Sequence, residues 1–289
     1  MKAAKDLKTA LRAVLRSPAA AASLMDTFLQ LELSREMERL LEKVRSEMPS
    51  NPAAHGFKVY SQADEDGILE TIFERLKIEV GSFVEIGCGN GLENNTHYLL
   101  LKGWRGTWVD GDPANIALIR AALPSSERLR VIELMVDREN ATSLLDIDSP
   151  GISSELDLLS VDIDGNDFDV VLSCAAAWRP KVIIVEYNAK FPPRTAIRVA
   201  YNPTHEWDRS DYQGASLAAL VDGLSTAYRL VSCSLAGTNA FFVRSDLSVA
   251  FDNLAPERLY QPARYHLTAF RSGHDPSLSF LQRSLAGDT

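Results

Sequence analysis

From residue 81 onward, short runs of apolar residues alternate with longer stretches that have helical spacing. The first five runs follow one another at intervals of about 20 to 30 residues, the rhythm of strand, helix and parallel strand. In chain order, the runs are SFVEI, TWVD, RVIEL, LDLLSVD, KVIIVEY, YRLVSC and AFFVR. The last two are separated by only a few residues, and LAGTN between them is typical of a hairpin turn. The pattern predicts an α/β fold with a doubly wound, mostly parallel sheet that ends in an antiparallel pair.

Residues 1–47 have helical rather than strand-like spacing. Their apolar side chains recur at Phe28, Leu31, Met37, Leu40, Leu41 and Val44. Pro18 is expected to divide the segment, and the basic residues before it predict an amphipathic surface helix. A linker rich in helix breakers at 48–56 precedes a helix that should begin near Ser61. We therefore divide the chain into a helical extension (1–56), an α/β domain (57–250) and a C-terminal tail (251–289).

The composition argues against a nucleic-acid-binding protein and against a membrane or secreted protein. A formal charge of −9 argues against extended nucleic-acid binding, which needs a positive surface. No apolar run is long enough for a membrane helix, and Asp6 and Asp26 interrupt any signal-like pattern at the N-terminus. The three cysteines stand far apart without metal-binding spacing, which favours free thiols in a reducing compartment. We expect a cytoplasmic protein without stable membrane insertion.

The stretch FVEIGCGNG, residues 83–91, is the strongest local signal. A strand ends in Glu85 and opens into a loop with three glycines, which let the backbone turn sharply and approach a ligand closely. These glycines are Gly87, Gly89 and Gly91. The next helix, with Asn95 or Thr96 as its expected cap, offers free N–H groups and the positive end of its dipole. The loop predicts a nucleotide-like ligand.

Two further acids follow the next two strands. Asp110 lies 25 residues after Glu85, where a carboxylate can accept hydrogen bonds from both ribose hydroxyls. Asp137 follows the third strand, where it could meet an adenine amino group. A lone Asp after a strand usually marks a turn, but the glycine loop and the two acids in this order favour a nucleoside ligand.

This order of motifs resembles the class I S-adenosylmethionine-dependent methyltransferases. The stretches YSQADEDGIL, FVEIGCGNGLENNT, DLLSVDIDGND and VEYN further resemble the FkbM-like methyltransferase family. The resemblance covers about residues 58–245 and implies a Rossmann-like sheet of seven strands with the last strand reversed. It also implies S-adenosylmethionine as cofactor and O-methylation of a small metabolite or a sugar in secondary metabolism or glycan decoration. In this comparison Gln62 would lie over the methionine end of the cofactor.

Carboxylates are concentrated where the fourth strand ends, in DLLSVDIDGND. Asp162 follows this strand, while Glu186 and Asn188 occupy the corresponding position after the fifth. The three are oxygen ligands that could hold Mg²⁺, which would lower the pKa of a substrate hydroxyl. The alternative is that Asp162 faces the cationic end of the cofactor and that Asp164 contacts substrate or caps the next helix.

The segment 201–217 lies between the fifth and sixth strands, a place that shapes the substrate pocket in the methyltransferases it resembles. His205 is a candidate general base, because its unperturbed pKa lies near neutrality. Lone histidines are more often structural, however. Trp207 and Tyr212 are candidates for lining a sugar or aromatic pocket, with core packing as the alternative.

The leading hypothesis is therefore a methyltransferase acting on a hydroxyl of a small molecule or glycan. N-methylation remains an alternative, because an amine needs less activation and no metal. An NAD-dependent oxidoreductase is disfavoured by the GxGxG spacing and the terminal hairpin. A third possibility is a protein that binds the cofactor without catalysis. The N-terminal helices could pair two subunits into a homodimer.

Overall fold

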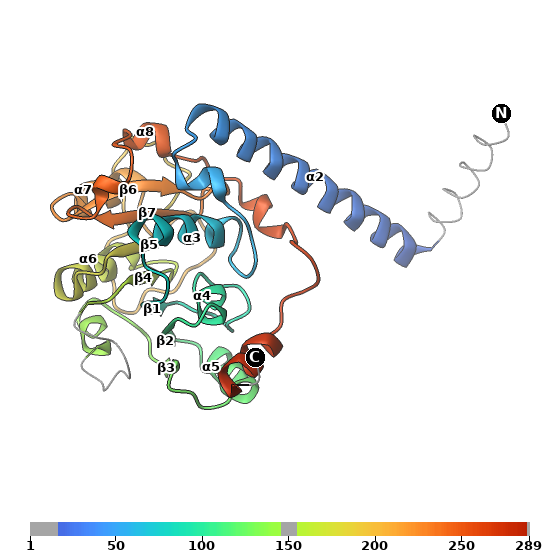
Figure 1. Ribbon diagram of the computed structural model, residues 1–289, viewed down its shortest axis with the longest axis horizontal. Helices are drawn as coiled ribbons and strands as arrows, with labels where there is room; N and C mark the ends of the chain where they lie inside the picture. The colour runs from blue at the N-terminus through green and yellow to red at the C-terminus, as the bar shows by residue number, and fades with distance from the viewer. Residues whose placement is uncertain (1–16, 146–154, 288–289) are drawn as a thin grey trace.

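The computed structural model describes residues 17–145 and 155–287, and its centre is one seven-stranded sheet (Figure 1). The strands are β1 (Ser82–Ile86), β2 (Arg105–Asp110), β3 (Leu129–Glu133), β4 (Leu158–Val161), β5 (Val182–Glu186), β6 (Tyr228–Cys233) and β7 (Asn239–Arg244). Their order in the sheet is β3-β2-β1-β4-β5-β7-β6, with β7 antiparallel to both of its neighbours. The predicted Rossmann-like fold with a reversed last strand is confirmed.

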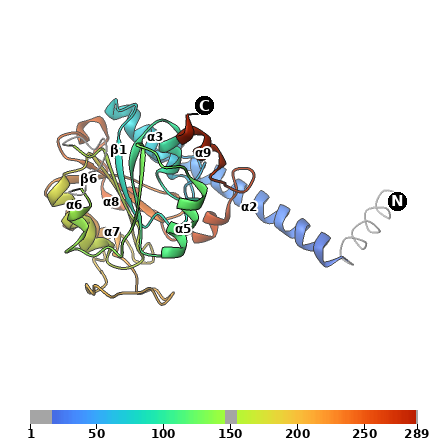
Figure 2. The same cartoon turned by 90° about the horizontal axis from the view of Figure 1, so that it is seen from below.

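Helices cover both faces of the sheet, as Figure 2 shows. The helices of the α/β domain are α3 (Glu65–Leu76), α4 (His97–Leu101), α5 (Pro113–Ala122), α6 (Asp167–Trp178) and α7 (Leu217–Leu224). Buried side chains of α3, α4 and α5 pack on one face, and those of α6 and α7 pack on the other. Because both faces are covered, the central strands read as continuous apolar runs without alternation.

Helix α3 begins at Glu65, four residues later than the pattern around Ser61 predicts. Asp66 explains the delay, because one oxygen of its carboxylate accepts hydrogen bonds from the backbone N–H groups of Val59, Tyr60 and Ser61 at 2.7–2.9 Å. The hydroxyl of Ser61 donates to the same oxygen. These contacts hold the preceding segment in a turn, so the helix cannot extend back to Ser61.

Helix α2 (Pro18–Glu47) precedes the domain and extends away from it at its N-terminal end (Figure 1). Ser17 caps the helix and Pro18 is its first residue, as the expected division at Pro18 requires. Its buried face consists of Leu33, Met37, Leu40 and Val44. Phe28 and Leu31, predicted to share that face, are instead 57% and 44% exposed, because the helix has left the body there.

The predicted basic surface helix before Pro18 lies outside the described residues. No helix in the described parts of the chain is both long and apolar enough to cross a membrane. Short 3-10 helices complete the domain: η1 (Pro52–His55), η2 (Ala141–Leu144) and η3 (Ser248–Ala250).

The C-terminal segment packs against the domain through α8 (Pro256–Leu259), η4 (Tyr265–Ala269) and α9 (Ser279–Ala286). Each of these short helices places one leucine in the core. Arg128 donates to the carbonyl oxygen of Ser284 at 2.6 Å, and Gln30 of α2 donates to that of Ala269 at 2.9 Å. Within the segment, α8 packs against β6 and α7, η4 against α2, and α9 against α4. Helix η4 also reaches the site described next.

Candidate active site

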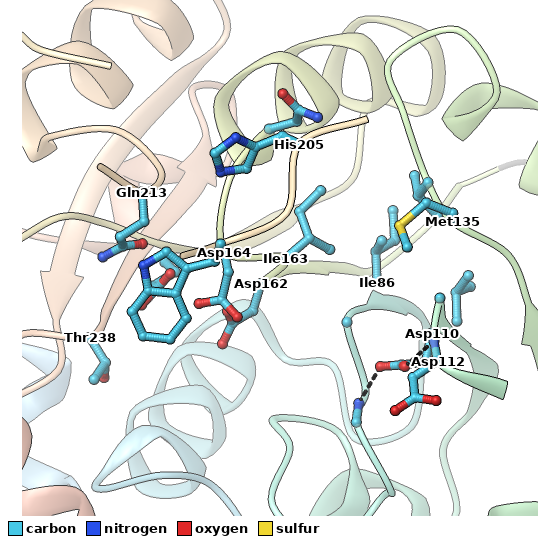
Figure 3. A pocket seen from close by; sticks show the side chains of 18 of the residues that line it. Ile86, Asp110, Asp112, Met135, Asp162, Ile163, Asp164, His205, Gln213 and Thr238 are labelled. Atoms are coloured by element: carbon cyan, nitrogen blue, oxygen red, sulfur yellow. Dashed lines mark hydrogen bonds between the residues drawn. The ribbon is translucent and has the colours of Figure 1, made fainter. Parts of the chain in front are cut away.

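A cavity of about 760 Å³ lies at the carboxyl ends of β1, β2, β4 and β5 (Figure 3). This is the edge where open parallel sheets bind their ligands, because the strand order changes direction there. At one end the cavity is lined by the glycine loop and Asp110, which we call the cofactor arm after the ligand that the sequence predicts there. At the other end it is lined by Asp162, Asp164, Glu186 and the loop that carries His205, which we call the acceptor arm after the predicted substrate.

The glycine loop has the backbone geometry that its sequence predicts. Gly87, Gly89 and Gly91 have φ values of 88°, 56° and 76°, in the left-handed region that favours glycine. A Cβ atom at Gly87 would lie 1.6 Å from the carbonyl oxygen of Asp162, so β1 and the loop after β4 touch there. A Cβ at Gly89 would meet nothing within 4 Å, because this glycine faces the cavity. Gly91 does not line the cavity and packs on Trp108.

Asp110, at the end of β2, is held firmly by the backbone around it. One carboxylate oxygen accepts from the N–H of Gly89 at 2.8 Å, and the other accepts from the N–H of Asp112 at 2.9 Å. The side chain of Asn115 also donates to it, at 3.1 Å. Figure 3 shows the carboxylate beside the glycine loop on the cavity wall. A carboxylate has further lone pairs, so Asp110 can still accept hydrogen bonds from a ligand.

Glu85 and Asn95, both predicted to bind the cofactor, do not line the cavity and instead support its wall. Glu85 is 3% exposed; its carboxylate accepts from the N–H of Asn95 at 2.8 Å and from the hydroxyl of Thr96. Burial raises the pKa of Glu85 to about 7. The side chain of Asn95 donates to Ser160 of β4 at 3.1 Å. This network joins the start of α4 to β1 and β4.

His97 adds a second contact behind the glycine loop. Its Nδ1 lies 2.8 Å from the carbonyl oxygen of Gly91, and its ring stacks on Tyr60 with 3.6 Å between the centroids. Burial lowers the pKa of His97 to about 4, so the ring is neutral at physiological pH.

Asp137 does not line the cavity either. Its carboxylate accepts from the N–H groups of Glu139 at 2.9 Å and Asn140 at 2.7 Å, so it shapes the turn before η2. The wall is formed at this point by Leu134, Met135 and Val136, which come just after β3. Contact of Asp137 with adenine remains a prediction.

Three carboxylates come together in the acceptor arm. Oxygen atoms of Asp162, Asp164 and Glu186 all lie within 4.8 Å of one another. Burial raises the pKa of Asp162 and of Glu186 well above the usual range, and repulsion from neighbouring carboxylates, Asp167 and Asp164 among them, raises both pKa values further. Asp164 has a left-handed backbone, with φ of 57°, in the tight turn after β4. Asp167 does not line the cavity, and its carboxylate accepts from the N–H groups of Ile163 and Gly165, both at 2.7 Å.

Asn188, the third predicted metal ligand, lines the cavity but uses its side chain to hold a loop. Its Nδ2 donates to the carbonyl oxygens of Asp211 at 2.9 Å and Gln213 at 3.0 Å. Its Oδ1 accepts from the N–H of Lys190 at 3.3 Å. Asp164, predicted as a substrate residue, is thus the third carboxylate of the cluster.

The acceptor arm also contains buried polar atoms without a protein partner. They are Oε2 of Glu186, Oε1 of Gln213 and Nε2 of His205. Figure 3 shows Gln213 and His205 on the same side of the cavity as Asp162 and Asp164. Buried polar atoms are usually hydrogen-bonded in native proteins, so these atoms are suited to meet a ligand.

Trp207 and Tyr212 of the segment 201–217 were both candidates for lining the substrate pocket, but only Trp207 lines the cavity. Trp207 lines the cavity, is 43% exposed, and donates its Nε1–H to the carbonyl oxygen of Ser210 at 2.8 Å. Tyr212 is 54% exposed and outside the lining, and its hydroxyl accepts from the N–H of Ala200 at 3.1 Å. Tyr212 therefore supports the loop, while its role in substrate binding stays a prediction.

Gln62 lines the cavity, and its contact with the methionine end of the cofactor stays a prediction. Glu65, which follows it closely in the chain, has a structural role. The carboxylate of Glu65 accepts from the hydroxyl of Thr238 at 2.8 Å and from Asn239 at 3.2 Å, which fastens the segment before α3 to the β6–β7 turn. Thr238 itself lines the cavity, as does Tyr265 of η4. No local motif marks these two residues, because only folding brings them to the site.

Comparisons with known proteins leave the family of this chain open. No protein-family profile matches it, and no curated protein matches it. Among solved structures, a TehB-like S-adenosylmethionine-dependent methyltransferase from Corynebacterium glutamicum is 14% identical, with 73% of this chain and 100% of that chain covered and a TM-score of 0.37.

Two further solved structures have similarly low sequence identities and TM-scores. A methyltransferase from Podospora anserina with bound S-adenosylhomocysteine is 16% identical, with 73% and 88% of the two chains covered and a TM-score of 0.39. Fibrillarin from Aeropyrum pernix with natively bound S-adenosylmethionine is 12% identical, with 57% and 66% covered and a TM-score of 0.37. These low scores and identities show a similarity of fold and do not identify the reaction.

Proposed function

We propose that the protein transfers the methyl group of S-adenosylmethionine to a hydroxyl oxygen of a small metabolite or a sugar. The observation that carries this proposal is the continuity of the cavity. A left-handed glycine loop and a strand-end Asp110 form one arm, and an acidic cluster forms the other, at adjoining strand ends. One cavity can therefore hold a nucleoside-bearing methyl donor beside a nucleophile.

In this proposal the cofactor arm holds the nucleoside. Asp110 accepts from the ribose hydroxyls, and the open face of Gly89 allows the ligand to approach the backbone. Ile86 and Met135 provide apolar contacts for the base (Figure 3), and Gln62 lies at the methionine end. Glu85 and Asn95 act behind the wall by holding the loop.

The reaction breaks the bond between the methyl carbon and the sulfonium sulfur, which keeps the electron pair. The hydroxyl oxygen forms the new bond from the opposite side, so oxygen, carbon and sulfur must be collinear. The hydroxyl proton must also leave. Asp162, Glu186 and the unpartnered Nε2 of His205 are the basic groups in the acceptor arm that could take it.

A divalent cation such as Mg²⁺ suits the acidic cluster. Asp162, Asp164 and Glu186 offer hard oxygen ligands close together, and a cation would offset their repulsion. When bound, Mg²⁺ would polarise the acceptor hydroxyl and lower its pKa. We propose Asp164 in place of Asn188 as the third ligand, because the Asn188 side chain is hydrogen-bonded to the loop.

The acceptor arm also bears on the alternatives. If the segment 201–217 lay far from the cavity, a protein that binds the cofactor without catalysis would be favoured. His205 and Trp207 of this segment line the cavity instead, which supports an enzyme. An N-methyltransferase remains the alternative enzyme, because an acidic cluster also attracts an amine.

We also propose a cytoplasmic location and a homodimer that forms through α2. The exposed apolar side chains of Met25 and Phe28, near the N-terminal end of α2, support the homodimer.

Calorimetric titration of S-adenosylhomocysteine into the purified protein, in EDTA buffer, tests the proposal. We expect binding in the micromolar range, followed by methylation of members of a hydroxyl-bearing library with and without Mg²⁺. Asp110→Ala, which removes the predicted ribose contact, should weaken binding about 100-fold, as expected for the loss of two charge-assisted hydrogen bonds. A folded wild-type protein that binds no S-adenosylhomocysteine, with or without Mg²⁺, would contradict the proposal.

A further inference from the structure

The cavity wall is strongly acidic. Its carboxylates are Glu93, Asp110, Asp112, Asp162, Asp164, Glu186 and Asp211. Among the described residues of the lining, Lys190 is the one lysine or arginine, and its ammonium group is paired with Asp211. Clefts lined by charges of one sign concentrate the opposite ion and repel ions of the same sign. Seven carboxylates and one lysine give the wall a formal charge of −6, and one divalent cation would bring it to −4, so the wall opposes a negatively charged ligand in either case.

Lys58, which stands just behind the wall, does not supply a free cation either. Its ammonium group donates to the carbonyl oxygens of Gln62 at 2.8 Å and Thr268 at 3.1 Å, and it lies 3.5 Å from Glu93. Its side chain is 11% exposed. These contacts fasten the segment before α3 to η4, so Lys58 closes the cavity without offering a site for a phosphate or a carboxylate.

The unpartnered atoms of the acceptor arm favour a ligand that donates hydrogen bonds. Oε1 of Gln213 is a buried acceptor without a partner, and Gln213 is 9% exposed. A hydroxyl group can donate to this oxygen and can also accept, for instance from His205. A phosphate or a carboxylate can only accept, and would leave this oxygen unsatisfied.

Trp207 provides an apolar surface beside these polar groups. The hydrogen bond from its Nε1 to Ser210 orients the indole, and the side chain stays 43% exposed at the cavity. A sugar ring has the matching character, since its C–H groups can pack on the indole while its hydroxyls reach the polar atoms. The acidic wall attracts a cationic group, but a protonated amine has no lone pair to react, so the reacting group of the acceptor is an uncharged hydroxyl.

We infer that the acceptor is an uncharged polyhydroxyl ring, such as a neutral sugar unit packed on Trp207, and that the acidic wall excludes acceptors with a phosphate or carboxylate group. This inference rests on the proposed methyl transfer and specifies its substrate class. It excludes nucleotides, acyl carriers with phosphate groups and uronic acids as preferred acceptors.

The electrostatic part of the inference can be tested before the acceptor is known. Two thiol reagents of opposite charge report the sign of the potential in the cavity through the rates at which they modify a cysteine there. Trp207→Cys places a thiol in the wall, whereas the three natural cysteines are buried. Its reaction rates with cationic trimethylammonium-ethyl and anionic sulfonato-ethyl methanethiosulfonate would be followed by mass spectrometry in EDTA. Val249→Cys, at a position 89% exposed and outside the cavity lining, serves as control, with the wild-type protein as blank.

We expect the ratio of cationic to anionic rates to be about 10-fold or more higher for Trp207→Cys than for the control, as an acidic cleft requires. Adding Asp164→Asn should lower the ratio, and so should salt, which screens the field. A ratio no higher than that of the control would overturn the inference. This outcome is separate from the S-adenosylhomocysteine titration, whose failure would contradict the methyltransferase proposal itself.

The substrate class has its own test in the methylation assay. Methyl glycosides would be compared with the corresponding uronates and sugar phosphates, each with S-adenosylmethionine, in wild-type protein and in Trp207→Ala. We expect methylation of uncharged glycosides only, and a KM for them that rises at least 10-fold in Trp207→Ala while folding is retained. An anionic sugar methylated faster than its uncharged parent would overturn the inference.

Discussion

Asp110 and Asp162 both follow a parallel strand at the same edge of the sheet, yet their carboxylates have different surroundings. Asp110 accepts from two backbone N–H groups and the side chain of Asn115, so both of its carboxylate oxygens have hydrogen-bond partners. Asp162 lies beside Asp164 and Glu186, and its pKa is raised by burial and then by repulsion from Asp167 and Asp164. The cofactor arm is therefore complete in the protein alone, whereas the acceptor arm needs a bound cation, a proton or a ligand to balance its charges.

The largest effect on turnover is expected for Asp162, whose negative charge the protein alone does not balance. Asp162→Asn should lower turnover by about 1000-fold, the upper range for a lost electrostatic contact in an active site. The same change should raise the free energy of unfolding by about 1 kcal/mol, because it removes a buried, repelled carboxylate. Rates of S-adenosylhomocysteine formation and urea unfolding would measure the two effects. Unchanged turnover would remove Asp162 from the mechanism.

Asp211→Asn is the matched control for this variant. Asp211 also lines the acceptor arm, but its carboxylate is exposed and paired with Lys190. Exposed ion pairs contribute at most about 1 kcal/mol, so stability should change little in this variant. A turnover loss as large as that of Asp162→Asn would mean that the net charge of the arm matters more than the position of its carboxylates.

Two glycines of the cofactor arm allow a similar comparison. Gly87→Ala should destabilise the fold by about 4 kcal/mol or more, because the new Cβ would overlap the carbonyl oxygen of Asp162. Gly89→Ala should cost only about 1–2 kcal/mol for its left-handed backbone, since no atom lies near its Cβ. Urea unfolding would give both values. Equal losses would show that backbone conformation, not contact between the two strand ends, dominates.

The pKa of Glu85 predicts a dependence of stability on pH. Its pKa is 4.5 in the absence of the fold and about 7 in the folded protein, because of burial. Between these values the folded protein holds a proton that the unfolded chain has released. The contribution of Glu85 to the free energy of unfolding therefore falls as pH rises from 4.5 to 7, by about 3 kcal/mol in total.

Glu85→Gln removes this titration and isolates it from the other acids. Urea unfolding of both proteins between pH 4 and pH 8 should give a flatter curve for the variant, with the difference developing between pH 4.5 and pH 7. Parallel curves would mean that the hydrogen bonds from Asn95 and Thr96 keep the carboxylate charged throughout.

The smallest expected effect concerns Tyr212, which the sequence placed at the substrate. Tyr212→Phe removes one acceptor for the N–H of Ala200 at an exposed position, so stability should fall by less than about 1 kcal/mol. The KM for an identified acceptor should change less than 3-fold, in contrast to Trp207→Ala. A rise of 10-fold or more with unchanged kcat would indicate direct contact between Tyr212 and the substrate.

Local chemistry made several features predictable. Apolar runs with a regular spacing indicated the sheet, and three glycines in left-handed conformations were identifiable because other residues rarely adopt that backbone. Asp110, Asp162 and Glu186 were found because parallel strands end at one edge. The beginning of α3 was not predictable in this way, because Asp66 holds three N–H groups of the turn that precedes it.

By itself, the sequence determined the order of the strands along the chain, the glycine turn and the acids that end the strands, since each depends on neighbours in the chain. Only the tertiary structure decided which acids face the cavity. Glu85 and Asp137 turn to nearby N–H groups, whereas Asp164 joins Asp162 and Glu186. The physical reason is that a carboxylate's surroundings depend on which N–H donors and charges folding brings within reach, and those come from distant segments.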